Sequence, residues 1–85
     1  MNTDFLNLFN EIKNIIINEF PYLNNKIDFT FFKSSNEYFI LIYDENAYFH
    51  NKDFLKLLFE IKKDILWKRS IYNVFLSYDE EKQTK

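Results

Sequence analysis

The chain has 85 residues and a formal net charge of −2, and it contains no cysteine and no glycine. Without cysteine there is no disulfide scaffold, no cysteine zinc site and no thiol nucleophile. Without glycine there is no P-loop, no Rossmann turn and no glycine-built nucleophile elbow. No apolar run approaches the ~20 residues of a membrane span. The start of the sequence also lacks the basic residues of a signal peptide, so we expect a cytoplasmic protein.

Aromatic residues are unusually frequent in this chain. They make up 21% of it, with eleven Phe and six Tyr among them. Each such side chain buries ~150–250 Å², so a short chain can build a core from a few large residues. We expect a single domain over residues 1–78 and a frayed, charged tail over residues 79–85, where hydrophobic periodicity is absent.

The first predicted element is a helix over residues 4–19. Its apolar residues recur at the spacing of one helix face, and they are Phe5, Leu8, Phe9, Ile12, Ile15 and Ile16. Thr3 or Asp4 can cap the first amides of this helix. Pro21 ends it, because the residue before a proline is pushed out of the helical region.

Two strands follow, over residues 26–32 and 37–43, with a hairpin turn between them over residues 33–36. The second strand contains an unbroken apolar and aromatic run from residue 38 to residue 43. Such a strand needs cover on both faces, or it keeps one face for a partner. Residues 44–46 are expected to be polar, solvated chain. Because glycine is absent, asparagine has to supply the tight-turn positions, and the candidates are Asn24, Asn25, Asn36 and Asn46.

The second predicted helix covers residues 51–67, with Asn51 or Asp53 as its cap. Its main apolar stripe consists of Phe54, Leu57, Leu58, Ile61 and Ile65. A second stripe consists of Leu55, Phe59 and Leu66. This second stripe either packs against the first helix or extends a groove or dimer seam. Trp67 either anchors a partner or plugs one end of the core.

The third predicted strand covers residues 71–78, so the order of elements is α-β-β-α-β. We predict an α+β fold, a single small domain in which two helices pack on one face of a three-stranded sheet. The strand over residues 37–43 takes the centre of the sheet. The third strand lies parallel beside it, after a crossover through the second helix. A third strand beside the first one is the alternative.

An uncovered sheet face is the first candidate for a binding surface. If the odd-numbered residues of the first strand face the helices, the opposite face displays Thr30, Phe32, Phe39, Leu41, Tyr43 and Phe75. This face would bind a partner protein or a second copy of the chain, unless another part of the chain covers it. It could also stack nucleic-acid bases, but the strands offer Lys26 and Lys33 against Asp28, Glu37 and Asp44, which disfavours phosphate.

One basic cluster ends the second helix, and it consists of Lys62, Lys63, Lys68 and Arg69. Positive charge there matches the negative end of the helix dipole, and it also suits an acidic protein or a phosphate group. His50 is the only histidine, and with Asp44, Glu45 and Asp53 it fits no established spacing of metal ligands. No serine and no pair of acids is placed for catalysis, so we expect no enzyme activity and no cofactor.

These features lead to one functional hypothesis and two rivals. The hypothesis is a small non-enzymatic inhibitor that masks a surface on a partner, as immunity proteins, antitoxins and phage anti-defence or anti-CRISPR proteins do. The first rival is a nucleic-acid-binding module that uses the aromatic sheet face and the basic end of the second helix. The second rival is the subunit of a structural homodimer. The candidate partner-binding residues are Phe32, Phe39, Leu41, Tyr43, Phe75, Leu55, Phe59 and Trp67.

Overall fold

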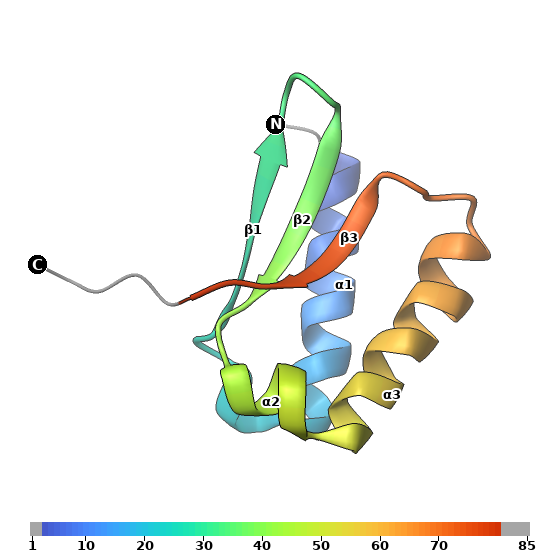
Figure 1. Cartoon of the computed structure of the whole chain (residues 1–85). Coiled ribbons are helices and arrows are strands. Elements are labelled where there is room, and N and C mark those ends of the chain that lie inside the picture. Colours follow the sequence, from blue (N-terminus) through green and yellow to red (C-terminus); the bar gives the residue numbers. More distant parts are fainter. Residues whose placement is uncertain (1–2, 81–85) are drawn as a thin grey trace, which may run out of the picture.

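A three-stranded sheet and three α-helices make up the computed structural model, which describes residues 3–80 (Figure 1). The helices are α1 (Thr3–Glu19), α2 (Glu45–His50) and α3 (Lys52–Ile61). The strands are β1 (Ile27–Phe32), β2 (Glu37–Ile42) and β3 (Val74–Tyr78). A 3-10 helix, η1 (Pro21–Leu23), follows α1, and a π-helical segment, η2 (Lys62–Trp67), continues α3. The predicted α+β class and element order are confirmed, with α2 as an additional short helix.

The strands lie in the predicted order β1-β2-β3. β1 and β2 pair antiparallel, so that Thr30 lies opposite Phe39. β2 and β3 pair parallel, so that Phe39 also lies beside Phe75. The apolar run in β2 therefore occupies the centre of the sheet, where both edges of the strand are hydrogen-bonded. The alternative, in which the third strand pairs with the first, is wrong.

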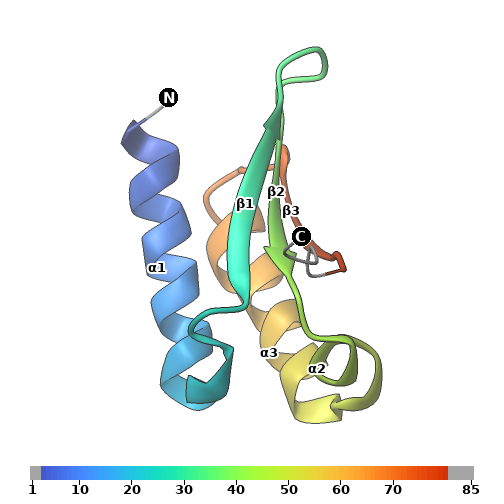
Figure 2. The same cartoon turned by 90° about the vertical axis from the view of Figure 1, so that its left-hand side faces the viewer.

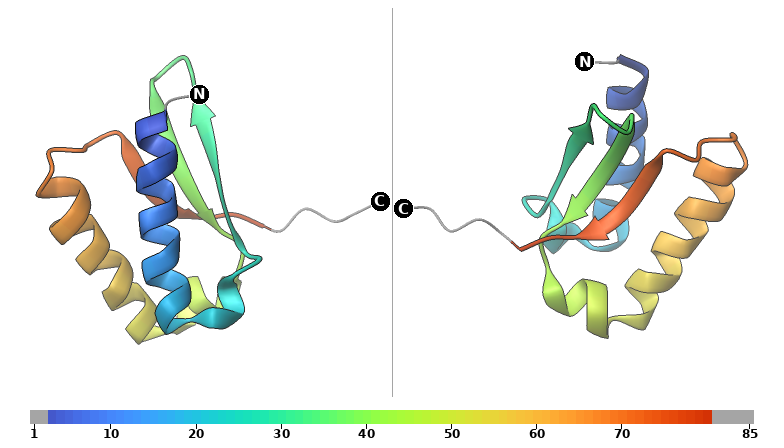
Figure 3. Two further views of the ribbon diagram at one scale, coloured as in Figure 1. Left: turned by 180° about the vertical axis from the view of Figure 1, so that it is seen from behind. Right: turned by 45° about the horizontal axis from the view of Figure 1, so that its top comes forward.

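The core lies between α1, α3 and one face of the sheet. Figure 2 and the left view of Figure 3 show α1 along that face. Phe5 joins the two layers, because its ring stacks on Tyr38 at 3.9 Å between centroids and meets Phe29 edge-on at 5.1 Å. Full burial of one such side chain contributes roughly 1.5–3 kcal/mol. The buried residues are Phe5, Leu8, Phe9, Ile12, Ile16, Leu23, Ile27, Ile40, Ile42, Ala47, Phe54, Leu57, Leu58, Ile61, Leu66 and Val74.

Side-chain caps begin both α2 and α3. Asp44 Oδ1 accepts a hydrogen bond from the Ala47 amide at 2.9 Å, and Asn51 Oδ1 accepts one from the Phe54 amide at 3.0 Å. Each bond satisfies an amide of the first helical turn that lacks a partner within the helix. The cap predicted at Asn51 is confirmed. Glu45 and Asn46 are solvated as predicted, but the chain is helical there, since it enters α2 at Glu45.

The last turns of the second predicted helix are π-helical. A π-turn joins residues five apart instead of four, so the buried positions in it are also five apart. Ile61 and Leu66 are both buried, whereas Ile65 between them is half-buried. The prediction that Leu66 belongs to the second stripe, with Leu55 and Phe59, is therefore wrong. The extra residue in the turn rotates Leu66 into the core.

Two residues hold the left-handed backbone positions of the described chain. Asn36 has φ 56° and Ser70 has φ 58°. The prediction for Asn36 is confirmed, since it ends the hairpin turn before β2. Asn24 and Asn25 form the predicted turn, which Lys26 N closes by donating to Leu23 O at 2.9 Å, although neither residue has a left-handed backbone. The prediction for Asn46 is wrong, because this residue lies within α2.

The remaining element boundaries differ slightly from the predicted ones. α1 ends at Glu19, ahead of Pro21 as predicted. β3 begins at Val74 rather than at residue 71, because the chain needs residues 68–73 to return from η2 to the sheet. Residues 81–85 of the predicted tail lie outside the described residues.

Candidate binding surfaces

A row of three phenylalanine rings crosses the side of the sheet that faces away from α1. Phe32 of β1 and Phe39 of β2 have ring centroids 5.0 Å apart, and Phe39 and Phe75 of β3 are 5.2 Å apart. Figure 1 is viewed from this side, and no helix lies in front of the strands. We call this surface the open sheet face, and its strand residues are Asp28, Thr30, Phe32, Glu37, Phe39, Leu41, Phe75 and Ser77.

The burial of the strands determines which residues belong to this face. Ile27, Ile40, Ile42 and Val74 are buried against the helices, and successive side chains of a strand point to opposite faces. The structure therefore brings together five of the six residues predicted for the uncovered face. Phe32 is 50% exposed and Phe75 is 39% exposed, whereas Phe39 and Leu41 are half-buried by their neighbours on the edge strands. Tyr43, the sixth residue, follows the end of β2 and is half-buried.

The charges that the strands place on the open sheet face are negative. They belong to Asp28 and Glu37. Asp79, one residue after β3, continues the alternation of that strand on the same face. Lys26, one residue before β1, is the basic residue with this alternation. Asp28 also accepts a hydrogen bond from the Phe29 amide at 2.8 Å, and this amide points away from β2. The open sheet face thus has an apolar centre and a mainly acidic rim.

A second exposed apolar surface lies on α3. Leu55 is 39% exposed and Phe59 is 52% exposed, so of the two alternatives for this stripe, the one in which these residues pack against α1 is wrong. Lys63 lies over the Phe59 ring, with its Nζ 5.8 Å from the centroid. A hollow of about 150 Å³ beside this stripe separates α3 from β3. The residues that line it are Tyr48, Leu55, Leu58, Phe59, Lys62 and Leu76.

Trp67 lies on the outside of η2 and does not plug the core. It is 47% exposed, and Lys62 Nζ lies 5.7 Å from the centre of its ring. The two side chains are five residues apart in sequence, which the π-turn brings to the same side of the helix. Contacts between a cation and an aromatic face stabilise by about 0.5–1 kcal/mol at exposed sites. Trp67 is thus available for contact but lies on a different element from the open sheet face.

The predicted basic cluster is divided by an ion pair. Arg69 donates two hydrogen bonds to Glu11 of α1, at 3.0 and 2.8 Å. This bidentate bond lowers the pKa of Glu11, partial burial opposes it, and the positive charge of Arg69 adds a smaller lowering effect. Lys62 and Lys63 lie on the outer side of η2, beside aromatic rings. The cluster is therefore smaller than the sequence suggested.

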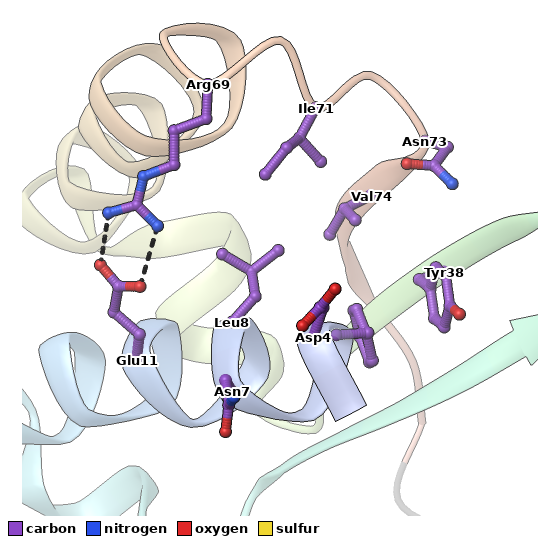
Figure 4. A pocket seen from close by; sticks show the side chains of 10 residues that line it. Asp4, Asn7, Leu8, Glu11, Tyr38, Arg69, Ile71, Asn73 and Val74 are labelled. Atoms are coloured by element: carbon purple, nitrogen blue, oxygen red, sulfur yellow. Dashed lines mark hydrogen bonds and ion pairs between the residues drawn. The ribbon is translucent and has the colours of Figure 1, made fainter. Parts of the chain in front are cut away.

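A pocket of about 320 Å³ lies between the first half of α1 and the chain that leads into β3 (Figure 4). The Arg69–Glu11 pair closes one end of it, and Tyr38 and Asn73 lie at the other end. The Asn73 side chain donates to the Asn36 carbonyl at 2.9 Å, which links this end of the pocket to the hairpin turn. The residues that line the pocket are Asp4, Phe5, Asn7, Leu8, Glu11, Tyr38, Arg69, Ile71, Asn73 and Val74.

The candidate metal ligands and nucleophiles lie apart from the pocket in the described part of the chain. His50 is exposed at the end of α2. Among residues 3–80, no group of three or more His, Asp or Glu side chains is placed to hold a metal ion. The side chains of the pocket in Figure 4 include no serine, cysteine or histidine.

Sequence reasoning missed an aromatic cluster at the end of β3. Phe49, which is 54% exposed, meets Tyr78 edge-on at 5.1 Å, and Tyr48 meets Phe49 at 5.2 Å. Partial burial, and then the nearby carboxylates led by Glu45, raise the pKa of Tyr78 above its ordinary value of 10.0. The cluster depends on α2, which sequence reasoning did not predict. The signal for it was Asp44, a good cap three residues ahead of Ala47.

In comparisons with known proteins, no family model matches the chain, and no curated protein and no solved structure is a significant match. Among the described residues, the helices are too short or too polar for any of them to cross a membrane.

Proposed function

We propose that this protein is a non-enzymatic binding protein that masks a surface of a partner protein with its open sheet face. The observation that carries the proposal is the row of Phe32, Phe39 and Phe75, one ring from each strand, on a face that no helix covers. Large aromatic side chains that stay partly exposed are typical of interfaces, where they supply most of the binding energy.

The charge of the face supports a protein partner over a nucleic acid. Base-stacking platforms act together with Lys or Arg residues that neutralise phosphate. On the open sheet face the charged strand residues are Asp28 and Glu37. Lys62 and Lys63 of η2 lie on another side of the molecule. A partner protein that presents an apolar protrusion surrounded by basic residues fits this surface better, because its basic residues would pair with Asp28 and Glu37.

The size of the face supports a partner larger than a second copy. Three strands of about six residues cover roughly 14 by 20 Å, or about 300 Å². Stable interfaces bury about 800 Å² on each partner, so a two-fold dimer through this face alone would fall short. A partner that reaches past the sheet, onto the hairpin turn or the edge of β3, would bury enough surface.

The proposed mode of action is inhibition by occlusion, of the kind that immunity proteins, antitoxins and anti-CRISPR proteins use. Inhibition by occlusion requires a surface that is complementary in shape to the partner, and it requires no catalytic group in the binding protein. The aromatic row supplies a rigid, flat surface, because its rings are held by the strands beneath them and by one another. Rigid contact residues lose little conformational entropy on binding, which favours a tight complex.

Photo-crosslinking in the cells that carry the gene tests the proposal. The photoreactive residue p-benzoylphenylalanine replaces Phe75 on the open sheet face or, as the matched control, Tyr72, which is 68% exposed just before β3. We expect the probe at position 75 to crosslink to one protein and the probe at position 72 to give much less of that product. Crosslinks to nucleic acid or to a second copy, equal products from both positions, or no protein product at position 75 would contradict the proposal.

A second step tests the named residues with the purified partner. Leu41→Asp and Phe75→Asp should each weaken the complex by at least about tenfold, because each puts an unpaired charge into the apolar contact. Tyr72→Asp should leave the affinity within about twofold. Circular dichroism before the binding measurement shows that each variant is folded.

A further inference from the structure

The outer edge of β3 offers backbone hydrogen-bonding groups to a further strand. Tyr38 N donates to Asn73 O and Asp79 N donates to Ile42 O, so the odd-numbered backbone groups of this segment face β2. The even-numbered groups, those of Val74, Leu76 and Tyr78, therefore point away from the sheet. An edge of this kind is a template for pairing with an extended peptide.

The side-chain contacts to this edge are long. Tyr48 Oη donates to Leu76 O at 3.4 Å, and Ser77 Oγ donates to Tyr78 O at 3.4 Å. Hydrogen bonds from hydroxyl groups are ordinarily about 2.7–2.8 Å long, so these two contacts are weak. The amide groups of an incoming strand can replace them at little cost.

Helix α3 provides a floor on which such a strand can lie. α3 lies beside the outer edge of β3 in Figure 1 and in both views of Figure 3. Two adjacent helices span about 20 Å, whereas three strands span only about 14 Å and four strands about 19 Å. The helix layer is thus one strand wider than the sheet, which explains why Leu55 and Phe59 are exposed beside the hollow of about 150 Å³.

The charges around this groove are unevenly distributed. Lys62 lines the hollow, and Lys63 lies over the Phe59 ring. The acids of α3, Asp53 and Glu60, line a different hollow together with the end of α1. The opposite end of the edge is acidic, because Glu45, Asp79 and Glu80 lie near Tyr78. Acidic residues of a ligand therefore fit beside Lys62 and Lys63.

We infer that β3 accepts an extended, acidic segment of a partner protein as a fourth strand. Alternate apolar side chains of the segment cover Leu55 and Phe59, and a Glu or Asp of the segment pairs with Lys62 or Lys63. A second copy fits less well, since docking edge to edge would bring its own α3 into the space that α3 already occupies, with lysines facing lysines. This inference concerns an edge and a helix flank, so it stands whether or not the open sheet face binds a partner.

Selection from a displayed library of random ten-residue peptides on the full-length chain tests this inference. We expect the enriched peptides to alternate apolar and polar residues and to carry acids, and their binding should weaken as salt rises. Phe59→Asp and the double variant Lys62→Glu, Lys63→Glu should each reduce binding at least about tenfold. Tyr22→Asp, at an aromatic residue of η1 that is 56% exposed, is the matched control and should leave binding within about twofold.

N-methylation of the best peptide tests the strand pairing itself. Two versions of the peptide are compared, one methylated on its even-numbered amides and one on its odd-numbered amides. The version whose methylated amides face β3 should lose binding, whereas the other version should bind nearly as well as the unmethylated peptide. The inference is overturned if no peptide is enriched, if both methylation phases behave alike, or if Tyr22→Asp weakens binding as much as Phe59→Asp does. A dimer in sedimentation that Phe59→Asp dissociates would assign the groove to a second copy and also overturn it.

Discussion

Arg69 donates two parallel hydrogen bonds to Glu11, from Nη1 to Oε1 at 3.0 Å and from Nη2 to Oε2 at 2.8 Å. The bonds join the chain just after η2 to the middle of α1, and they close one end of the pocket in Figure 4. A planar fork that matches a carboxylate is the geometry in which Arg orients as well as attracts its partner. The pair therefore links α1 to the chain that leads from η2 into β3.

Glu11→Gln should lower the melting temperature by no more than a few degrees at neutral pH, because the Arg69 side chain is 49% exposed and that of Glu11 is 40% exposed, so solvent screens the pair. Arg69 lowers the pKa of Glu11 in the folded chain below its ordinary value of 4.5. The contribution of the pair is therefore present above the unfolded pKa and is lost as the pH falls through the folded pKa. Thermal unfolding of both proteins at neutral and acidic pH measures this difference.

The matched control for this variant is Glu19→Gln at the end of α1, an exposed acid. The difference between wild type and Glu11→Gln should disappear at low pH, where the carboxyl group is protonated in both states. If the difference persisted unchanged at acidic pH, the ion pair would not be its cause.

Leu66→Ala should destabilise the fold by about 2–5 kcal/mol, because it leaves a cavity at a fully buried position. Leu55→Ala removes the same atoms from a side chain that is 39% exposed, and it should cost less than about 1 kcal/mol. Urea unfolding of both variants gives the comparison. A regular α-helix would place Ile65 at the core position, so a larger cost for Ile65→Ala than for Leu66→Ala would contradict the π-turn.

Asp44→Ala should destabilise the protein by about 0.5–2 kcal/mol, since it removes the side-chain bond to the Ala47 amide at the start of α2. Asn46→Ala, at an exposed position inside the same short helix, is the control and should change stability by less than about 0.5 kcal/mol. Hydrogen exchange of the α2 amides would locate the effect. Equal losses from the two variants would mean that the cap does not hold α2.

The order and pairing of the strands could be predicted because one segment allowed few arrangements. Residues 38–43 are apolar on both faces, which places them in the middle of the sheet, and a hairpin turn of four residues then puts β1 on one side. Alternation along the strands divided the side chains into two sets, but β2 is apolar in both, so the sequence did not decide which set is exposed. The burial of Ile40 and Ile42 in the structure shows that the set with Phe39 and Leu41 forms the open sheet face. Local periodicity was thus sufficient for the strand pairing and insufficient for the choice of the open face.

The short helix and the π-turn could not be predicted in the same way. α2 has six residues, too few for a hydrophobic period to appear, and its cap was the only local signal. The spacing of Ile61, Ile65 and Leu66 fits an α-helix as well as a π-turn, and only packing against the sheet decides which residue is buried. The Arg69–Glu11 bond joins residues 58 apart, and no sequence pattern indicated it.

The stacked pair of Phe39 and Phe75 should stabilise the fold beyond the apolar area that it buries. Their ring centroids are 5.2 Å apart with 27° between the ring planes, and the two residues lie side by side in the parallel ladder. A double-mutant cycle with Phe39→Leu and Phe75→Leu should give a coupling energy of about 0.5–1.5 kcal/mol, toward the lower end because Phe75 is 39% exposed. Urea unfolding of the four proteins measures it.

The pair Phe39 and Ser77, on the same face but without a ring contact between them, is the control and should give a coupling energy near zero. If the ring pair also gave a coupling near zero, Phe39 and Phe75 would not support each other, and the open sheet face would lose the rigidity on which tight binding by occlusion depends.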